Sequence, residues 1–181
     1  MLKFAFSEAK AMAALGLIAK VRPGLTPLFV SKILFFAEKW HINRYGRPII
    51  ADTYIAMPRG PVPSTVKNFI DENWKWVDKP ERFEDFIGID NRDSLRRLIP
   101  GVKEPDLSLL SGTDVDCITD AVKFCDGKTA DELSEITHFE KSWRRVPVNS
   151  PMNFEDFIDD DNSQKEDILL EMYDTAASGV L

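Results

Sequence analysis

The sequence predicts a mainly helical α+β domain with one small strand element. Two observations favour helices: apolar residues recur at three- and four-residue spacing in several segments, and capping residues, prolines and glycines mark where these segments begin and end. The strand element is predicted near Ile49–Ala56, a short mixed run between two helical patterns.

The first predicted helix begins after Ser7, a suitable N-cap, and runs toward Val21. The second begins at Thr26-Pro27, because proline is tolerated at the first helical position, where its missing N–H is not needed. It is the predicted central buried element, through Leu28, Phe29, Ile33, Phe36 and Trp40. Tyr45-Gly46-Arg47-Pro48 ends it, since glycine adopts a left-handed cap and proline cannot continue the turn.

After the mixed run, Arg59-Gly60-Pro61-Val62-Pro63 is predicted to form a rigid loop, and a third helix follows from Thr65 to about Trp74. Prolines interrupt residues 76–105, which we expect to be an insertion or elaborated loop with a short helix near Asn91–Leu98. A further apolar stripe, Val115–Cys125, predicts the next helix.

A capping box, in which Thr129 and Glu132 each bond the other's amide, predicts the start of the last clear helix, which carries Thr137 and His138. Trp143 follows shortly after. At 181 residues the chain suits one domain with an appendage. We expect a domain over residues 1–146 and an acidic tail over residues 147–181.

The net charge of −7 is concentrated in the tail. Residues 148–181 carry nine acidic residues against one lysine, a net of −8, so residues 1–147 carry +1. A near-neutral body argues against nucleic acid as the partner, because phosphate binding needs clustered Lys and Arg. Two cysteines outside any zinc spacing fit a reducing compartment, and no long apolar run appears. We therefore expect a cytoplasmic protein without a membrane partner.

No motif for nucleophilic catalysis, metal binding or phosphate binding occurs, so we predict no catalytic residues, no cofactor and no metal. His41 is expected to be a core histidine bonded to the Arg59–Val62 loop, because imidazole satisfies buried backbone groups well. His138 is expected to complement the end of its helix.

Two sequence blocks resemble the Panacea domain, also called the SocA-like antitoxin domain, of bacterial and phage toxin–antitoxin pairs. The first is a buried helix followed by the Tyr45–Pro48 turn and Gly60-Pro61-Val62, and the second is the Thr137-His138 block with its later tryptophan. The resemblance covers roughly Phe4–Val146. It implies structural roles for the family-motif residues Trp40, His41, Tyr45, Gly46, Pro48, Thr137, His138 and Trp143.

The resemblance implies an antitoxin that neutralises a cognate toxin protein by direct protein–protein binding, and not an enzyme. For the SocA branch it also implies an adaptor that delivers the toxin to a cytosolic ATP-dependent protease. Two alternatives are such a proteolytic adaptor and a regulatory interaction module without a toxin; a hydrolase ranks last. A homo-oligomer stays open.

The predicted partner surface has three parts. Arg59, Gly60, Pro61 and Val62 would form a rigid recognition loop with little ordering cost on binding. Trp76 is a second candidate, as an exposed aromatic residue beside a loop. The tail is expected to be a solvated, partly disordered appendage, and Phe154 and Phe157 would anchor it where it covers a basic toxin surface.

Overall fold

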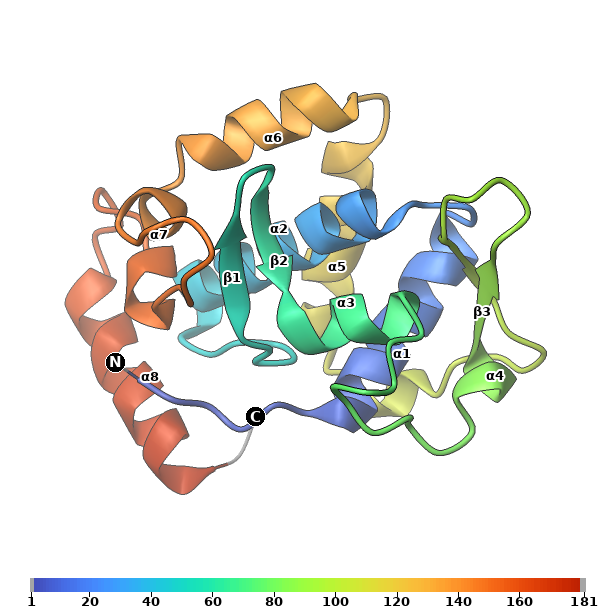
Figure 1. Ribbon diagram of the computed structural model, residues 1–181. Coiled ribbons are helices and arrows are strands. Elements are labelled where there is room, and N and C mark those ends of the chain that lie inside the picture. Colours follow the sequence, from blue (N-terminus) through green and yellow to red (C-terminus); the bar gives the residue numbers. More distant parts are fainter. Residues whose placement is uncertain (1, 180–181) are drawn as a thin grey trace.

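The computed structural model describes residues 2–179, which form a mainly helical α+β fold with two antiparallel strand pairs (Figure 1). This confirms the predicted fold class. The elements in chain order are α1 (Glu8–Val21), α2 (Pro27–Tyr45), β1 (Tyr54–Met57), β2 (Gly60–Pro63), α3 (Ser64–Ile70), α4 (Phe83–Phe86), β3 (Ile87–Asp90), β4 (Arg97–Pro100), η1 (Leu107–Leu109), α5 (Gly112–Cys125), α6 (Ala130–His138), α7 (Lys141–Arg144), η2 (Phe154–Phe157) and α8 (Lys165–Ser178). Within the described part of the chain, no helix is both long and apolar enough to cross a membrane.

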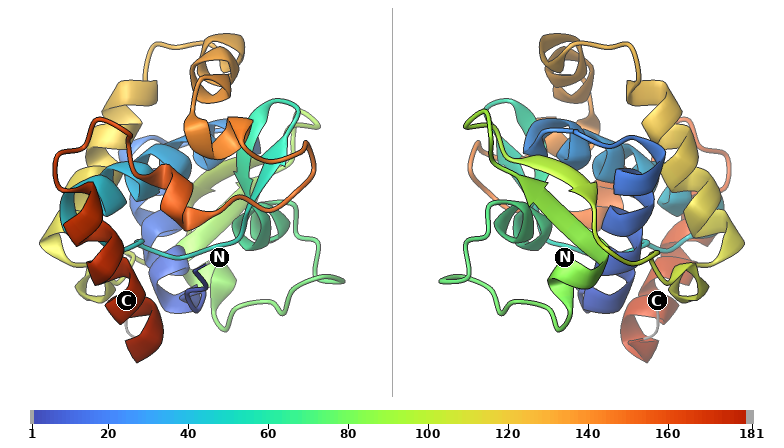
Figure 2. Two further views of the ribbon diagram at one scale, coloured as in Figure 1. Left: turned by 90° about the vertical axis from the view of Figure 1, so that its left-hand side faces the viewer. Right: turned by 90° about the vertical axis from the view of Figure 1, so that its right-hand side faces the viewer.

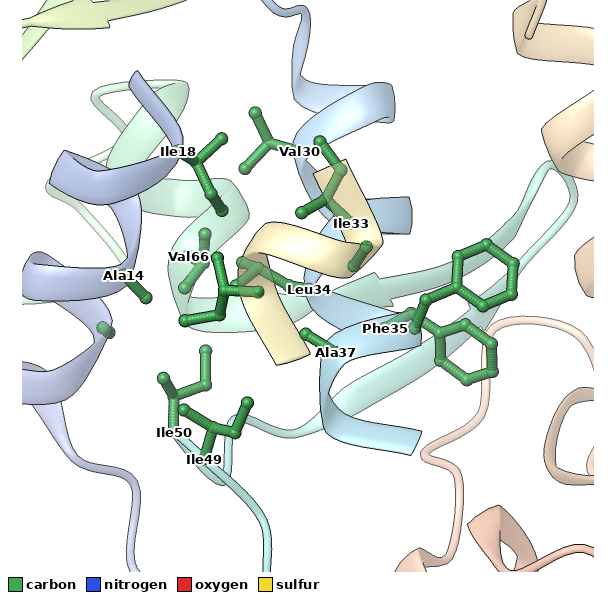
Figure 3. Close-up of a cluster of buried hydrophobic side chains, with 14 of the residues drawn as sticks. Ala14, Ile18, Val30, Ile33, Leu34, Phe35, Ala37, Ile49, Ile50 and Val66 are labelled. Carbon is green, nitrogen blue, oxygen red and sulfur yellow. The ribbon is translucent and has the colours of Figure 1, made fainter. Parts of the chain in front are cut away.

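Helix α2 is the centre of the fold, as the sequence predicts. It packs against α5 on one side and against the β1–β2 hairpin on another, and it also contacts α3, α6 and α8. Its middle turn, from Ile33 to Ala37, is therefore buried around the whole helix. Figure 3 shows Leu34 of this turn on the side of Ala14 and Ile18 of α1, Ile49, Ile50 and Val66, and Phe35 on the other side of the helix. Gly46 ends α2 in the left-handed conformation, with φ 67°.

The predicted loop over Arg59–Pro63 is instead a strand with the turn before it, which corrects the sequence-based assignment. Gly60–Pro63 is β2, which pairs antiparallel with β1. The outer edge of β1 bonds the start of the tail: Ala56 donates to Ser150 and Met152 donates to Tyr54. Because bonding positions alternate along an antiparallel strand, Pro61 and Pro63 occupy the outward positions of β2, where no N–H is needed.

The short helix expected near Asn91–Leu98 is wrong, because this part of the chain forms the β3–β4 hairpin. Leu98 of β4 is fully buried and forms a β-bridge with Leu25. Leu98 N donates to Leu25 O, and Gly24 N donates to Leu98 O (both 2.8 Å). The hairpin lies beside α1, as the right-hand view of Figure 2 shows. Burial of the hairpin against α1 therefore decides the structure of this segment, over its weak local helical pattern.

The tail is an ordered part of the core and not the solvated appendage that its charge suggests. Phe157 and Ile158 are 1% and 0% exposed, and Met172 of α8 is fully buried. The Phe157 ring lies 5.3 Å from that of Phe35 and 5.6 Å from that of Tyr54, between centroids. The buried residues before and after position 147 belong to one hydrophobic cluster. Most of the acidic residues of the tail are exposed, as in any amphipathic segment: Asp160, Asp161, Glu166, Asp167, Glu171 and Asp174. Glu155, Asp156 and Asp159 are half-buried.

Candidate functional site

The turn of the β1–β2 hairpin, residues 57–60 (the hairpin turn), is held by two aromatic side chains from α6 and α7. The indole Nε1 of Trp143 donates to the carbonyl of Met57 at 3.0 Å. His138 Nε2 lies 3.1 Å from the carbonyl of Pro58, and because a carbonyl only accepts, this nitrogen is the donor. The two rings stack with centroids 4.1 Å apart. Stacking therefore holds the imidazole and the indole in the orientations in which they donate to the hairpin turn.

Lys32 of α2 holds the next carbonyl of the hairpin turn, that of Arg59. Its Nζ donates to the carbonyl of Arg59 at 2.5 Å and to the hydroxyl of Thr137 at 2.8 Å. The Thr137 hydroxyl lies 3.0 Å from the α6 carbonyls of Leu133 and Ser134. The two sequence blocks that resemble the Panacea domain, far apart in the chain, thus meet at one turn.

Gly60 is the residue that lets Lys32 reach this position. A Cβ atom at Gly60 would lie 1.9 Å from the Lys32 Nζ and 2.3 Å from the Thr137 hydroxyl oxygen. Its φ of 102° is also a conformation that residues with a side chain rarely adopt. Both the space and the backbone angle therefore require glycine here.

Lys32 is 1% exposed, and within the described part of the chain its ammonium bonds two neutral oxygens, the carbonyl of Arg59 and the hydroxyl of Thr137. Burial, with the nearby positive charge of Arg59, lowers the pKa of Lys32 to about 7. A buried ammonium without a carboxylate is unfavourable, because protein atoms do not replace the lost hydration fully. The sequence-based interpretation missed this residue; its only signal is a lysine between buried neighbours on the central helix.

Arg59 carries the exposed charge of the hairpin turn. It pairs with Asp131 of α6 at 2.6 Å, and the two side chains are 57% and 93% exposed. Such an exposed pair contributes little to stability, since water and salt screen it. The guanidinium is therefore free to exchange this partner for another. Gly60 and Pro61 are buried and Val62 is half-buried, so these three residues shape the turn more than they face solvent.

A groove of about 300 Å³ lies beside the hairpin turn, between β2 and the first turns of α2. Apolar side chains and three cations line it, and no carboxylate does. The lining residues are Pro27, Leu28, Ser31, Lys32, Met57, Pro58, Arg59, Pro61, Val62 and Lys67.

His41 does not bond the Arg59–Val62 segment, which corrects the sequence-based expectation. It is fully buried, its Nδ1 donates to the carbonyl of Arg47 at 2.9 Å, and its Nε2 lies 3.0 Å from Asp114 Oδ1. Asp114 also pairs with Arg47 at 2.9 Å and Lys10 at 3.3 Å. Burial would raise the pKa of Asp114, but the bonds from His41 and the Ser111 amide, with both cations, hold it well below its usual range. This network joins α1, α2 and α5, a structural role.

The remaining motif residues of the first block also act in packing. Trp40 is half-buried, with its ring 5.5 Å from that of Phe124. Pro48 is buried, and Tyr45 is 44% exposed with its ring 4.7 Å from His41. Gly46 and Pro48 lie where the chain leaves α2 toward β1.

Glu38 is a second buried charged residue that the sequence-based interpretation missed. Its carboxylate is fully buried and accepts hydrogen bonds from the amides of Ile49, Ile50 and Ala51, at 2.5, 3.0 and 3.1 Å. Burial raises the pKa of Glu38 to about 7, although these amides oppose the shift. Its role is to hold the extended segment that precedes β1.

The other predicted partner residues do not join the hairpin turn. Trp76 is 77% exposed, but it lies in the segment between α3 and α4, at the opposite end of the hairpin from the turn (Figure 1). Phe154 and Phe157 are 8% and 1% exposed and pack in the core. They are therefore not surface anchors, which corrects that expectation.

Reactive groups are few in the described part of the chain. No group of three or more His, Cys, Asp and Glu side chains within residues 2–179 is arranged to hold a metal ion. Cys117 and Cys125 are buried free thiols, and burial raises the pKa of Cys125 to about 12. A thiol with such a pKa forms little of the nucleophilic thiolate near neutral pH.

The family described as antitoxin SocA-like, Panacea domain, matches residues 30–144, which is more than half of the chain and includes both blocks around the hairpin turn. No curated protein and no solved structure matches the chain.

Proposed function

This chain belongs to the SocA-like antitoxin, Panacea-domain family, and on that basis we propose that it is an antitoxin that neutralises a cognate toxin protein by direct binding in the cytoplasm. The observation that carries the proposal is the match over residues 30–144, which spans the whole hairpin turn and its supports. The family suggests a non-enzymatic role, and the buried thiols agree with it.

The proposed toxin-binding surface is centred on the hairpin turn. Arg59 supplies an exposed guanidinium, a group enriched among residues that dominate binding energy. The turn is held by Lys32, His138 and Trp143, so little conformational entropy is lost when a partner binds. Gly60, Pro61 and Val62 support this surface and set its shape.

The outer face of α8 is proposed as a second contact for a basic toxin surface. Glu166, Asp167, Glu171 and Asp174 are exposed there, next to the exposed apolar side chain of Leu170. Such a face attracts a cationic partner electrostatically. Because α8 is part of the core, its role is tested by reversing these charges and not by deleting the tail.

The test is co-expression with the neighbouring open reading frame, scored for growth rescue and then for co-purification. Rescue with a stable complex supports direct neutralisation. Rescue without a complex would favour an adaptor that delivers the toxin to an ATP-dependent protease. A neighbour that is harmless alone would contradict the antitoxin proposal and favour a regulatory module.

The matched variants are Arg59→Glu and Arg92→Glu. Both arginines are exposed and each pairs with one aspartate, Asp131 and Asp90 respectively, but Arg92 lies on the β3–β4 hairpin. Arg59→Glu is expected to weaken rescue and co-purification, and Arg92→Glu is expected to leave both unchanged. Equal rescue and equal co-purification for the two variants would contradict a toxin-binding role for the hairpin turn.

A further inference from the structure

The groove beside the hairpin turn has an unusual charge for this chain. The protein carries a net charge of −7, yet the ten residues that line the groove include three cations, Lys32, Arg59 and Lys67, and no carboxylate. Its remaining surface is largely apolar, through Leu28, Met57 and their neighbours. The groove is thus a local positive and apolar site on an acidic protein.

The three cations differ in how well they are neutralised. Arg59 and Lys67 form ion pairs with Asp131 and Asp71, and both pairs are partly exposed to water. Lys32 is buried and bonds only neutral oxygens among the described residues. An anion that enters the groove can therefore reach Arg59 and Lys67, whose side chains are exposed, whereas Lys32 is buried and holds the wall of the groove.

We propose that this groove binds a segment of the partner protein that carries a carboxylate next to apolar side chains. Under the proposed function, on which this inference rests, that segment belongs to the toxin. The carboxylate pairs with the exposed cations Arg59 and Lys67, and the apolar side chains cover Leu28, Met57 and Val62. Its volume of about 300 Å³ suits a few side chains of one segment.

Recognition in this groove is by side chains and not by strand addition. The outward positions of β2 are Pro61 and Pro63, which have no N–H to offer a new strand. The walls are already fixed, because Trp143, His138 and Lys32 hold the hairpin turn. Specificity therefore comes from charge and shape, and the groove selects acidic-apolar sequences.

The test uses a phage-displayed library of random linear peptides, selected on the full-length chain. We expect enriched peptides to carry Asp or Glu beside Leu, Val or Pro. Synthetic copies of these peptides should bind Lys67→Glu about tenfold more weakly than the parent protein, because one rim charge is reversed. The matched control is Lys123→Glu, since Lys123 is also exposed and ion-paired, with Asp120, but lies on α5 outside the groove.

The proposal is overturned if no peptides are enriched, if the enriched peptides lack acidic residues, or if Lys67→Glu binds them as well as Lys123→Glu does. Circular dichroism melting of both variants checks that they remain folded. Sedimentation tests whether the parent chain associates with itself. Self-association that Lys67→Glu abolishes would assign the groove to a second copy of the chain and would also overturn the proposal.

A second arm separates this inference from the proposed function. A neighbour-encoded toxin that binds parent and Lys67→Glu equally would contradict the groove while leaving the antitoxin proposal intact. A harmless neighbour would contradict the antitoxin proposal, and the peptide selection would still decide the chemistry of the groove.

Discussion

The Nζ atom of Lys32 lies 2.8 Å from the hydroxyl oxygen of Thr137, although the two residues are 105 positions apart in the chain. The same nitrogen bonds the carbonyl of Arg59, so one buried ammonium joins the central helix, the hairpin turn and α6. This arrangement explains why Gly60 and Thr137, in separate sequence blocks, belong to one structural unit. The proposed binding surface therefore lies on a turn that side chains from α2, α6 and α7 hold.

Gly60→Ala tests how tightly the hairpin turn is packed. The new Cβ would overlap the Lys32 Nζ and would sit at a φ of 102°, so the free energy of unfolding is expected to fall by about 3 kcal/mol. Gly127→Ala is the control: its φ is 74°, but no atom lies within 4 Å of the added Cβ. It is expected to cost about 1 kcal/mol. Urea unfolding compares the two, and equal losses would contradict the packing argument.

Lys32→Met tests the buried ammonium through the pH dependence of stability. The folded-state pKa of Lys32, about 7, is below the ordinary value of 10.5, so between these values the unfolded chain binds more protons and stability rises with pH. From about pH 6 to about pH 8.5, Lys32 is expected to add about 2 kcal/mol to the free energy of unfolding of the parent protein. The variant should lack this gain.

The pH profile of the Lys32→Met variant must be compared with that of the parent protein, because Glu38 changes stability with pH in the direction opposite to Lys32. Its raised pKa, also about 7, means that the folded chain binds more protons below that value, so stability from Glu38 falls as pH rises through it. This fall is common to parent and variant. Parallel pH profiles for the two proteins, measured by urea unfolding, would show that the Lys32 ammonium carries no such penalty.

Trp143→Phe tests the indole bond to the hairpin turn. Phenylalanine keeps a ring against His138 but leaves the carbonyl of Met57 without this donor, so a loss of about 1 kcal/mol is expected in thermal or urea unfolding. Trp76→Phe, at a 77% exposed position, should change stability by no more than about 0.5 kcal/mol. A larger effect at position 76 than at 143 would reverse the assignment of these two tryptophans.

Phe157→Ala tests whether the tail is part of the core. The side chain is 1% exposed and packs against Phe35 and Tyr54, so its removal should cost about 4 kcal/mol in urea unfolding. Leu170→Ala removes a 65% exposed side chain from α8 and should have little effect. A small loss for Phe157→Ala would restore the view of the tail as a solvated appendage.

Local signals in the sequence predict helix boundaries well in this protein. Ser7 caps α1, Gly46 ends α2 in the left-handed conformation, and Thr129 with Glu132 forms the capping box of α6, all as expected. Each of these depends on bonds between residues close in the chain, so sequence alone carries the information.

Elements that depend on distant contacts were not predictable in this way. Prolines in β2 suggested a loop, yet both lie at positions that face away from β1, and β1 itself pairs with the tail at its other edge. Similarly, the β3–β4 hairpin is decided by burial of Leu98 against α1. Lys32 and Glu38 look like solvent-facing charges on a helix, since their backbone partners come from other elements.

The most direct test of the central claim is the affinity of the purified chain for the purified product of the neighbouring toxic gene, measured by isothermal titration calorimetry. Direct neutralisation predicts stoichiometric binding that Arg59→Glu weakens by about tenfold and that Arg92→Glu leaves unchanged. No binding between two folded, purified proteins that nonetheless show growth rescue in cells would contradict it.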